Sequence, residues 1–278
     1  MHSLPVLLII LILVVAAYLY LAQHKMIYFP KPYDDFYFDE LPGSVLQIPY
    51  QTGAGNQVAF YFPPRDRNQG VPRVLWIMFG GNGSLALDWQ TFILQHPDAG
   101  AGFLLVDYPG FGKNEGNASP ESILSSSVQA FKALAKLLQV DEAALTNSVA
   151  LLGHSLGAAA ALLLALQYHP QQLILISPFT TMLNMAKRRV GIPLCYILKH
   201  RYNNRAHIAQ LVALPQPPRI TIFHGDRDEV IPVKMGRALY AAFPQAIKYV
   251  EVKGADHNSI LDDAEVEIYA AMQSELNL

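Results

Sequence analysis

The chain opens on a long uncharged apolar run, and shorter apolar runs recur along the rest of it. Residues 4–22 contain no charged side chain and consist of Leu, Ile, Val, Ala and Tyr with one early proline. A helix rises about 1.5 Å per residue, so such a run reaches across the roughly 30 Å hydrocarbon core of a bilayer. The pattern predicts an N-terminal transmembrane helix, with Tyr18 and Tyr20 at the level of an aromatic belt.

A cleaved signal peptide is the competing interpretation of this run. It fits less well because a basic leading segment is missing, the apolar stretch is longer than usual, and no small-residue cleavage pattern ends it. We therefore expect an uncleaved single-pass membrane anchor over residues 1–24, followed by an aromatic-rich irregular connector over residues 25–44. Lys25 and Lys31 favour a cytoplasmic position for the following domain, although the side of the membrane stays open.

Behind the connector, the spacing of apolar residues predicts a sheet. Residues 45–50 and 57–62 are expected to pair as an antiparallel hairpin at a sheet edge. Runs that are apolar on both faces are typical of parallel strands covered by helices on both sides. Six such runs follow, at residues 74–79, 103–106, 149–152, 173–176, 220–223 and 247–252. They predict one α/β domain over residues 45–278, a mostly parallel doubly wound sheet with a small helical cap at about 178–218.

Composition narrows the possible functions. The formal net charge is −2 in 278 residues, which gives no broad basic field and no support for nucleic-acid binding. The single cysteine, Cys195, excludes an internal disulfide framework, and its apolar neighbours favour a buried packing role. No Cys and His residues cluster at ligand spacing. We expect no cofactor and no metal.

The segment Gly153-His154-Ser155-Leu156-Gly157 lies between an apolar strand and a helix rich in small residues. This is the setting of a nucleophile elbow, a sharp strand-to-helix turn that holds its serine in a strained conformation. Glycines at both flanks let the strand and the helix approach closely. The alternative is an ordinary turn with an exposed serine, and other residues must decide between the two.

Two further motifs supply an acid and a base in the expected order. Asp228 follows the strand at 220–223, and His257 follows the strand at 247–252. The order Ser155, Asp228, His257 is that of the α/β-hydrolase scaffold, whereas other serine hydrolases order the same groups differently. Asp226 is the rival acid, and we prefer Asp228 because it lies deeper in its loop. His154 and His224, each at the buried end of a strand, are expected to be structural.

This arrangement predicts acyl transfer. His257 would take the proton of Ser155 Oγ as it attacks an acyl carbonyl, and Asp228 would orient the imidazole. The tetrahedral oxyanion needs backbone donors, for which we select the N–H groups of Leu156 and Asn82. The glycine-rich loop around Asn82 could also be a turn without a catalytic duty.

The cap region carries a basic cluster of five side chains. It faces either an anionic lipid surface or, as the simpler interpretation, solvent. Its members are Lys187, Arg188, Arg189, Lys199 and Arg201.

These motifs carry a family resemblance that spans most of the chain. The Ser155 elbow, the Asn82 loop, the segment Asp107–Gly112, the segment His224–Asp228 and His257 resemble the membrane-anchored α/β-hydrolase-domain serine hydrolases, a lipase, esterase and acyl-thioesterase group. The resemblance implies action on lipid esters, lysophospholipids or acyl thioesters on proteins. Two positions depart from the family pattern, with Gly80 in place of a histidine and Asn114 in place of a serine.

The sequence thus predicts a serine hydrolase that cleaves acyl ester or thioester bonds of lipid-like substrates through a Ser155 acyl-enzyme. Its expected partners are a small acyl substrate and the membrane. A catalytically inactive, membrane-bound interaction protein on the same scaffold is one alternative, which Gly80 supports. A serine peptidase is the other. Oligomeric state, acyl-chain length and headgroup stay open.

Overall fold

The computed structural model describes residues 3–66 and 71–273. The first two residues of the expected anchor and the last five of the expected domain lie outside this range. An eight-stranded sheet organises the domain, with the strand order β1-β2-β4-β3-β5-β6-β7-β8. Its strands are β1 Leu46–Thr52, β2 Gly55–Phe62, β3 Val74–Phe79, β4 Ala101–Val106, β5 Val149–His154, β6 Gln172–Ile176, β7 Arg219–Gly225 and β8 Ile247–Val252.

The pairing confirms the predicted sheet. β2 is antiparallel to both β1 and β4, while β4, β3, β5, β6, β7 and β8 are parallel neighbours. Six strands, all except β3 and β8, are longer than the runs that predicted them. β5 continues to His154 and pairs it with Ile176, and β7 continues to Gly225. The reason is that backbone hydrogen bonds extend the ladder past the last apolar side chain.

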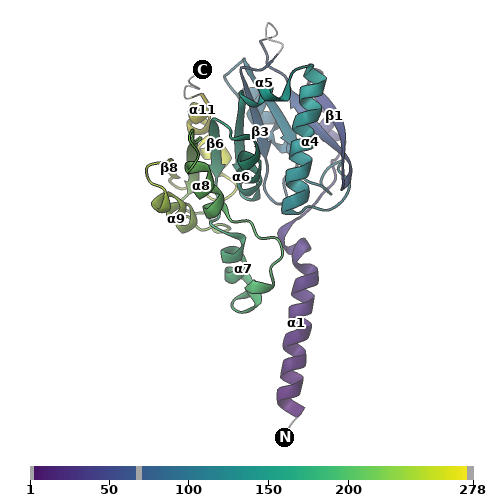
Figure 1. Cartoon of the computed structure of the whole chain (residues 1–278), viewed down its shortest axis with the longest axis vertical. Coiled ribbons are helices and arrows are strands. Elements are labelled where there is room, and N and C mark those ends of the chain that lie inside the picture. Colours follow the sequence, from purple (N-terminus) through teal and green to yellow (C-terminus); the bar gives the residue numbers. More distant parts are fainter. Residues whose placement is uncertain (1–2, 67–70, 274–278) are drawn as a thin grey trace.

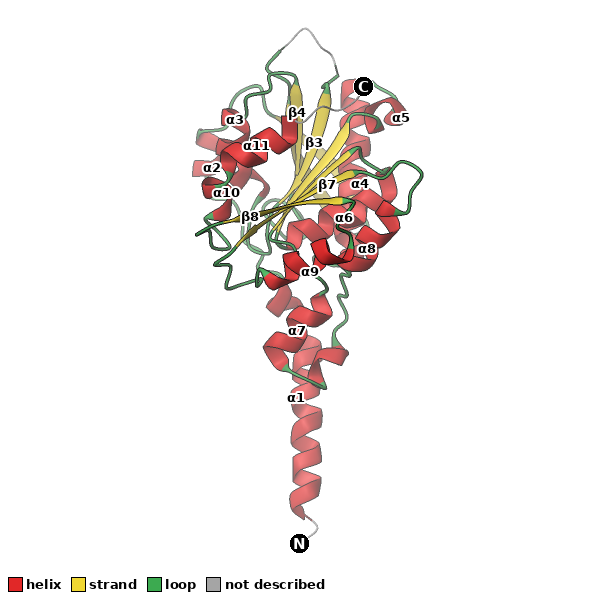
Figure 2. Ribbon diagram, turned by 90° about the vertical axis from the view of Figure 1, so that its left-hand side faces the viewer, coloured by secondary structure: helices red, strands yellow, loops and turns green. Residues whose placement is uncertain are grey.

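Helices cover both faces of the sheet (Figure 2). One face packs against α4 and α6, and its core holds Ile77, Phe131 and Leu162. The other face has its own core, which includes Trp76, Trp89 and Ile268. The helices of the domain are α2 Phe36–Asp39, η1 Ala86–Trp89, α3 Gln90–Gln95, α4 Pro120–Leu138, α5 Glu142–Thr146, α6 Leu156–Tyr168, α7 Met182–Val190, η2 Leu194–Ile197, α8 Asn204–Val212, α9 Lys234–Ala242, α10 Ile260–Asp263 and α11 Glu265–Gln273.

The segment between β6 and β7 contains α7, η2 and α8. Thr181 caps α7 by accepting a hydrogen bond from the Asn184 N–H, and Asn203 caps α8 in the same way. α7 lies at the end of the domain from which the N-terminal helix projects, as both views show (Figures 1 and 2).

The N-terminal helix, α1, spans Ser3–Ile27 and projects from the domain (Figure 1). It is long and apolar enough to cross a membrane, and its most apolar stretch has no buried residue. A signal sequence would show the same length and composition. The helix extends to Ile27, into the expected connector, because its last turns pack against the domain. The rest of that connector also packs there: the Tyr33 hydroxyl donates to Asp107 Oδ2 at 2.6 Å.

Candidate active site

Ser155 occupies the tight turn between β5 and α6. Its backbone has φ 59° and ψ −117°, a strained combination for a residue with a side chain. The flanking glycines explain how the turn forms. A methyl group at Gly157 would lie 2.6 Å from the Gly80 carbonyl oxygen and still closer to the Phe79 oxygen, and one at Gly153 would lie 2.6 Å from the Ala158 nitrogen. No side chain fits at either position.

Three predicted side chains meet at this turn. Ser155 Oγ lies 3.0 Å from His257 Nε2, and His257 Nδ1 lies 2.7 Å from Asp228 Oδ2. All three residues are buried, with at most 8% of their surface exposed. The carboxylate accepts from Nδ1–H, which leaves Nε2 as the acceptor for the serine O–H. The structure therefore joins the three residues in one hydrogen-bonded series.

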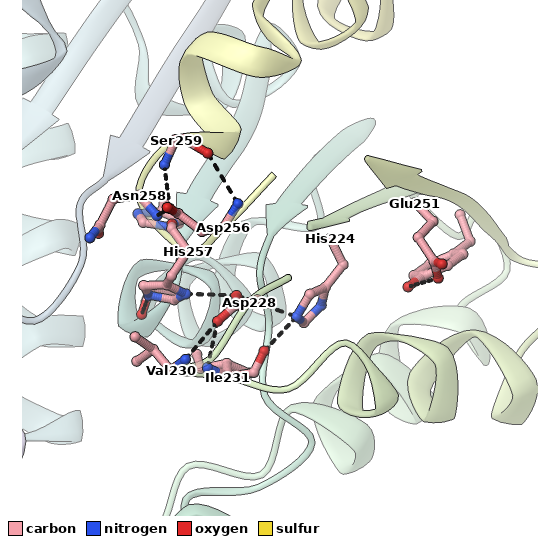
Figure 3. Close-up of polar contacts among 12 residues, drawn as sticks. His224, Asp228, Val230, Ile231, Glu251, Asp256, His257, Asn258 and Ser259 are labelled. Atoms are coloured by element: carbon pink, nitrogen blue, oxygen red, sulfur yellow. Dashed lines mark hydrogen bonds and ion pairs between the residues drawn. The ribbon is translucent and has the colours of Figure 1, made fainter. Parts of the chain in front are cut away.

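Asp228 is held as a charged acceptor (Figure 3). Its Oδ1 accepts the N–H groups of Val230 at 3.0 Å and Ile231 at 2.7 Å. Burial alone would raise the pKa of this carboxyl. The hydrogen bonds from His224, His257 and the backbone outweigh that effect and hold the pKa of Asp228 well below its ordinary value. The group is thus ionised at neutral pH.

Asp226, the alternative candidate for the acid, bonds to a different loop residue. Its Oδ1 accepts the Gly254 N–H at 2.7 Å, which ties the loop after β7 to the loop that carries His257. Because both loops follow neighbouring parallel strands, this bond fixes their spacing. Asp226 therefore acts on His257 indirectly, through the loop. Among the hydrogen bonds of the described residues, it is Asp228 that contacts the His257 ring.

His224 and His154 are buried, as expected of structural histidines, and both contact the site. His224 Nε2 lies 3.5 Å from Asp228 Oδ2 and 2.8 Å from the Ile231 carbonyl oxygen. His154 Nε2 lies 2.9 Å from the His257 carbonyl oxygen. Burial, and then the neighbouring His257, lowers the pKa of His154 to about 4, so it is neutral at pH 7 and donates to that carbonyl. The sequence feature that indicates this contact is their position at the ends of β5 and β7, close to Ser155 and Asp228.

The two predicted backbone donors lie on the walls of the same cavity as Ser155. Leu156 is the first residue of α6, and Asn82 lies in the loop after β3. That loop approaches Ser155 closely, since a methyl group at Gly81 would lie 3.7 Å from Ser155 Cβ. Asn82 also fixes the loop to the end of α1, because its carbonyl accepts the Phe29 N–H at 2.8 Å.

Both departures from the family pattern have a structural explanation. A side chain at Gly80 would meet Ser84 Cβ at 2.7 Å, and the Gly80 carbonyl accepts the Tyr108 hydroxyl at 2.6 Å. Gly80 is therefore part of a compact loop. The buried Asn114 donates to the Asp107 carbonyl at 2.8 Å and accepts the Val58 N–H at 2.7 Å, which links two segments of the domain. Neither departure disturbs the Ser155, His257 and Asp228 series.

A cavity of about 730 Å³ opens over Ser155. Its walls come from the end of α1, from α7 and η2, and from the loop after Asp228. Most of the lining is apolar, and it includes Met182 and Met185 of α7. Charged groups are also present, namely Lys25, Arg188, Arg189 and Glu229. The volume suits a ligand the size of a single lipid chain or a drug-like molecule. Within residues 3–66 and 71–273, no cluster of His, Cys, Asp and Glu is arranged to hold a metal.

The strand order and the tight turn at Ser155 are those of the α/β-hydrolase fold. The Hydrolase_4 family model, described as serine aminopeptidase, S33, matches residues 72–205. An uncharacterized protein of Mycobacterium tuberculosis is 29% identical over 266 residues, which cover 92% of this chain and 89% of that protein. The human alpha/beta hydrolase domain-containing protein 17C is 28% identical over 164 residues, 59% of this chain and 44% of its own length.

Solved structures show the same fold. An alpha-beta hydrolase from Vibrio vulnificus superposes with a TM-score of 0.68 at 15% identity and covers 92% of both chains. An esterase from the planctomycete Thermogutta terrifontis gives a TM-score of 0.56 at 16% identity, covering 84% of this chain and 91% of its own. These similarities show that the chain has the α/β-hydrolase fold.

Proposed function

We propose that this protein is a serine hydrolase that cleaves acyl ester or thioester bonds of lipid-like substrates at a membrane. The observation that carries the proposal is the buried series from Ser155 Oγ through His257 to Asp228, with distances of 3.0 and 2.7 Å, in which Ser155 lines a largely apolar cavity. A serine hydroxyl is a weak nucleophile unless a base takes its proton. The arrangement provides that base and holds it in place.

The reaction would run in two halves. In the first, Ser155 Oγ attacks the acyl carbonyl carbon while His257 Nε2 takes the hydroxyl proton and then gives it to the leaving alcohol or thiol. In the second, water gives its proton to His257 and attacks the acyl-enzyme. The proton returns to Ser155 as the carboxylic acid departs. Throughout, ionised Asp228 stabilises the imidazolium and fixes its tautomer.

The oxyanion that forms in each half would be held by two backbone donors. The N–H of Leu156 stands at the beginning of α6, where the helix dipole favours negative charge. The N–H of Asn82 is the second donor in this proposal, on the loop that Gly80 and Gly81 bring close to Ser155. Each donor of this kind is worth about 10²–10³ in kcat in serine hydrolases.

The cavity favours an amphiphile over a peptide. Three cationic side chains line it, Lys25, Arg188 and Arg189, against one carboxylate, Glu229. An aminopeptidase must bind a substrate ammonium group, which this charge balance repels. A serine peptidase is supported by the family model's description alone. An acyl ester with an anionic headgroup matches both the apolar walls and the cations.

The test is hydrolysis of p-nitrophenyl butyrate and of alanine p-nitroanilide by the full chain in detergent. We expect ester cleavage in the wild type, loss of at least a thousandfold in Ser155→Ala, and full activity in the control Ser44→Ala, whose exposed side chain lies outside the cavity. Faster cleavage of the amide would favour the peptidase. A folded wild type inert toward both would support a non-catalytic interaction protein.

A further inference from the structure

The last turns of α1 are bound to the hydrolase domain. Gln23 is buried, and its Oε1 accepts the Lys199 N–H of the cap at 2.6 Å. Directly after the helix, the buried Tyr28 hydroxyl lies 2.9 Å from that of Tyr202. The Lys199 ammonium also lies 3.7 Å from the centre of the Tyr20 ring. A segment removed as a signal sequence would take part of these contacts with it and leave the polar groups of the cap unpaired.

The same part of α1 forms a wall of the cavity over Ser155. Leu19, Gln23 and Met26, on successive turns of the helix, line the cavity together with Met182 and Met185 of the cap. α1 also contacts η2, which closes the space between helix and cap. Two lining residues of α1 are polar: Gln23, whose carbonyl oxygen is already bonded to the cap, and Lys25 near the end of the helix. The other three, Leu19, Met26 and Ile27, are apolar.

The depth of these residues along α1 connects the cavity with a bilayer. At 1.5 Å per residue, Leu19 lies about 22 Å from Leu4, within the roughly 30 Å of a hydrocarbon core, and Met26 lies about 33 Å from it, near the headgroups. The cap adds exposed apolar side chains beside the helix, since Ile192 and Tyr196 are each 57% exposed. The wall formed by α1 and the cap belongs to the same cavity as Ser155, so a ligand lying along it can reach the serine hydroxyl.

We propose that α1 is a retained part of the substrate site, whose cavity face from Leu19 to Met26 receives the acyl chain of a membrane-derived acyl substrate. This inference rests on the proposed function, since the chain would be the acyl group transferred to Ser155. It assigns to α1 a role in selecting chain length in addition to anchoring. Burial of each further methylene along the wall is worth about 0.8 kcal/mol, or roughly fourfold in kcat/KM, until the cavity is full.

The experiment compares p-nitrophenyl esters of four, eight and twelve acyl carbons on the full chain in detergent or nanodiscs. Leu19→Trp places a large ring in the cavity wall. Its matched control is Leu21→Trp, on the same helix but 78% exposed and outside the cavity. We expect Leu19→Trp to lower the ratio of twelve-carbon to four-carbon kcat/KM at least tenfold. Leu21→Trp should leave the ratio within twofold.

A second variant covers the case in which Leu19→Trp folds poorly. Leu19→Ala enlarges the same wall and should shift the optimum toward longer chains. An unchanged ratio in both Leu19 variants, or an equal shift in Leu21→Trp, overturns the inference.

Binding is measured in parallel with a fluorescent twelve-carbon fatty acid, which Leu19→Trp should bind at least tenfold more weakly than wild type. If the wild type cleaves no ester but still binds this probe along α1, the catalytic proposal fails while the role of α1 stands.

Discussion

Replacing Gly157 by alanine should separate Ser155 Oγ from His257 Nε2 without changing either side chain. The added methyl group would lie 2.6 Å from the Gly80 carbonyl oxygen, whereas ordinary contacts begin near 3.4 Å. The helix α6, or the strand β3 beside it, must therefore move by at least about 0.8 Å. Because Ser155 joins β5 to α6, its Oγ moves with the helix, away from the 3.0 Å contact with His257 Nε2.

A misplacement near 1 Å costs about a hundredfold in rate, or about 2.7 kcal/mol of transition-state stabilisation. The overpacked methyl should also lower the free energy of unfolding by about 1–3 kcal/mol. The control is Gly83→Ala in the loop after β3, where the nearest atom to the new methyl is Phe29 Cβ at 3.8 Å. It should keep both activity and stability.

The assay pairs ester kinetics with urea unfolding of the same preparations in detergent. A folded Gly157→Ala protein with wild-type kcat/KM would refute the reasoning, since the close approach of helix and strand would then not be needed to place Ser155. An equal loss in Gly83→Ala would show that any change in this region disturbs the site.

Three further outcomes follow from the same geometry. Asp228→Asn keeps the shape of the carboxylate but removes its charge, and should lower kcat about 10⁴-fold with KM little changed, as steady-state kinetics will show. The lowered pKa of His154, about 4, means that the unfolded chain takes up a proton between pH 6.5 and 4 that the folded chain does not. On going from pH 7.5 to 4, wild type should therefore lose about 3 kcal/mol more unfolding free energy than His154→Gln, and equal losses in urea titrations would contradict this assignment. The double change Arg188→Gln with Arg189→Gln should reduce kcat/KM about tenfold for an anionic acyl ester and little for a neutral one, whereas Lys187→Gln, on the same turn but outside the cavity, should affect neither.

Much of the fold could be predicted because periodicity and turn chemistry agree along the chain. β3 and β8 have the bounds that their apolar runs predict, and Ser119 caps α4 ahead of a proline in the first turn. The sequence also indicated which side chains would meet, because Ser155, Asp228 and His257 all follow parallel strands, whose carboxyl ends share one edge of the sheet.

Other features depend on contacts between distant segments, which no local pattern reveals. The pairing of Gln23 with Lys199 across 176 residues, which joins α1 to the cap, is one of them. Gly80 differs from the family pattern because Ser84 and Tyr108 occupy its surroundings, a reason visible only in three dimensions. The contact of His224 with Asp228 is also visible only in the structure. The position of His224 at a strand end predicted that it is buried, but it did not predict that Asp228 is its partner.

The most direct test of the central claim is covalent labelling with a fluorophosphonate, followed by mass spectrometry of the modified peptide. The account predicts one label on Ser155 in the wild type, no label in Ser155→Ala, and labelling slowed at least a hundredfold in His257→Gln, with all three proteins folded. A folded wild type that stays unlabelled, or that carries its label on another residue, would contradict it.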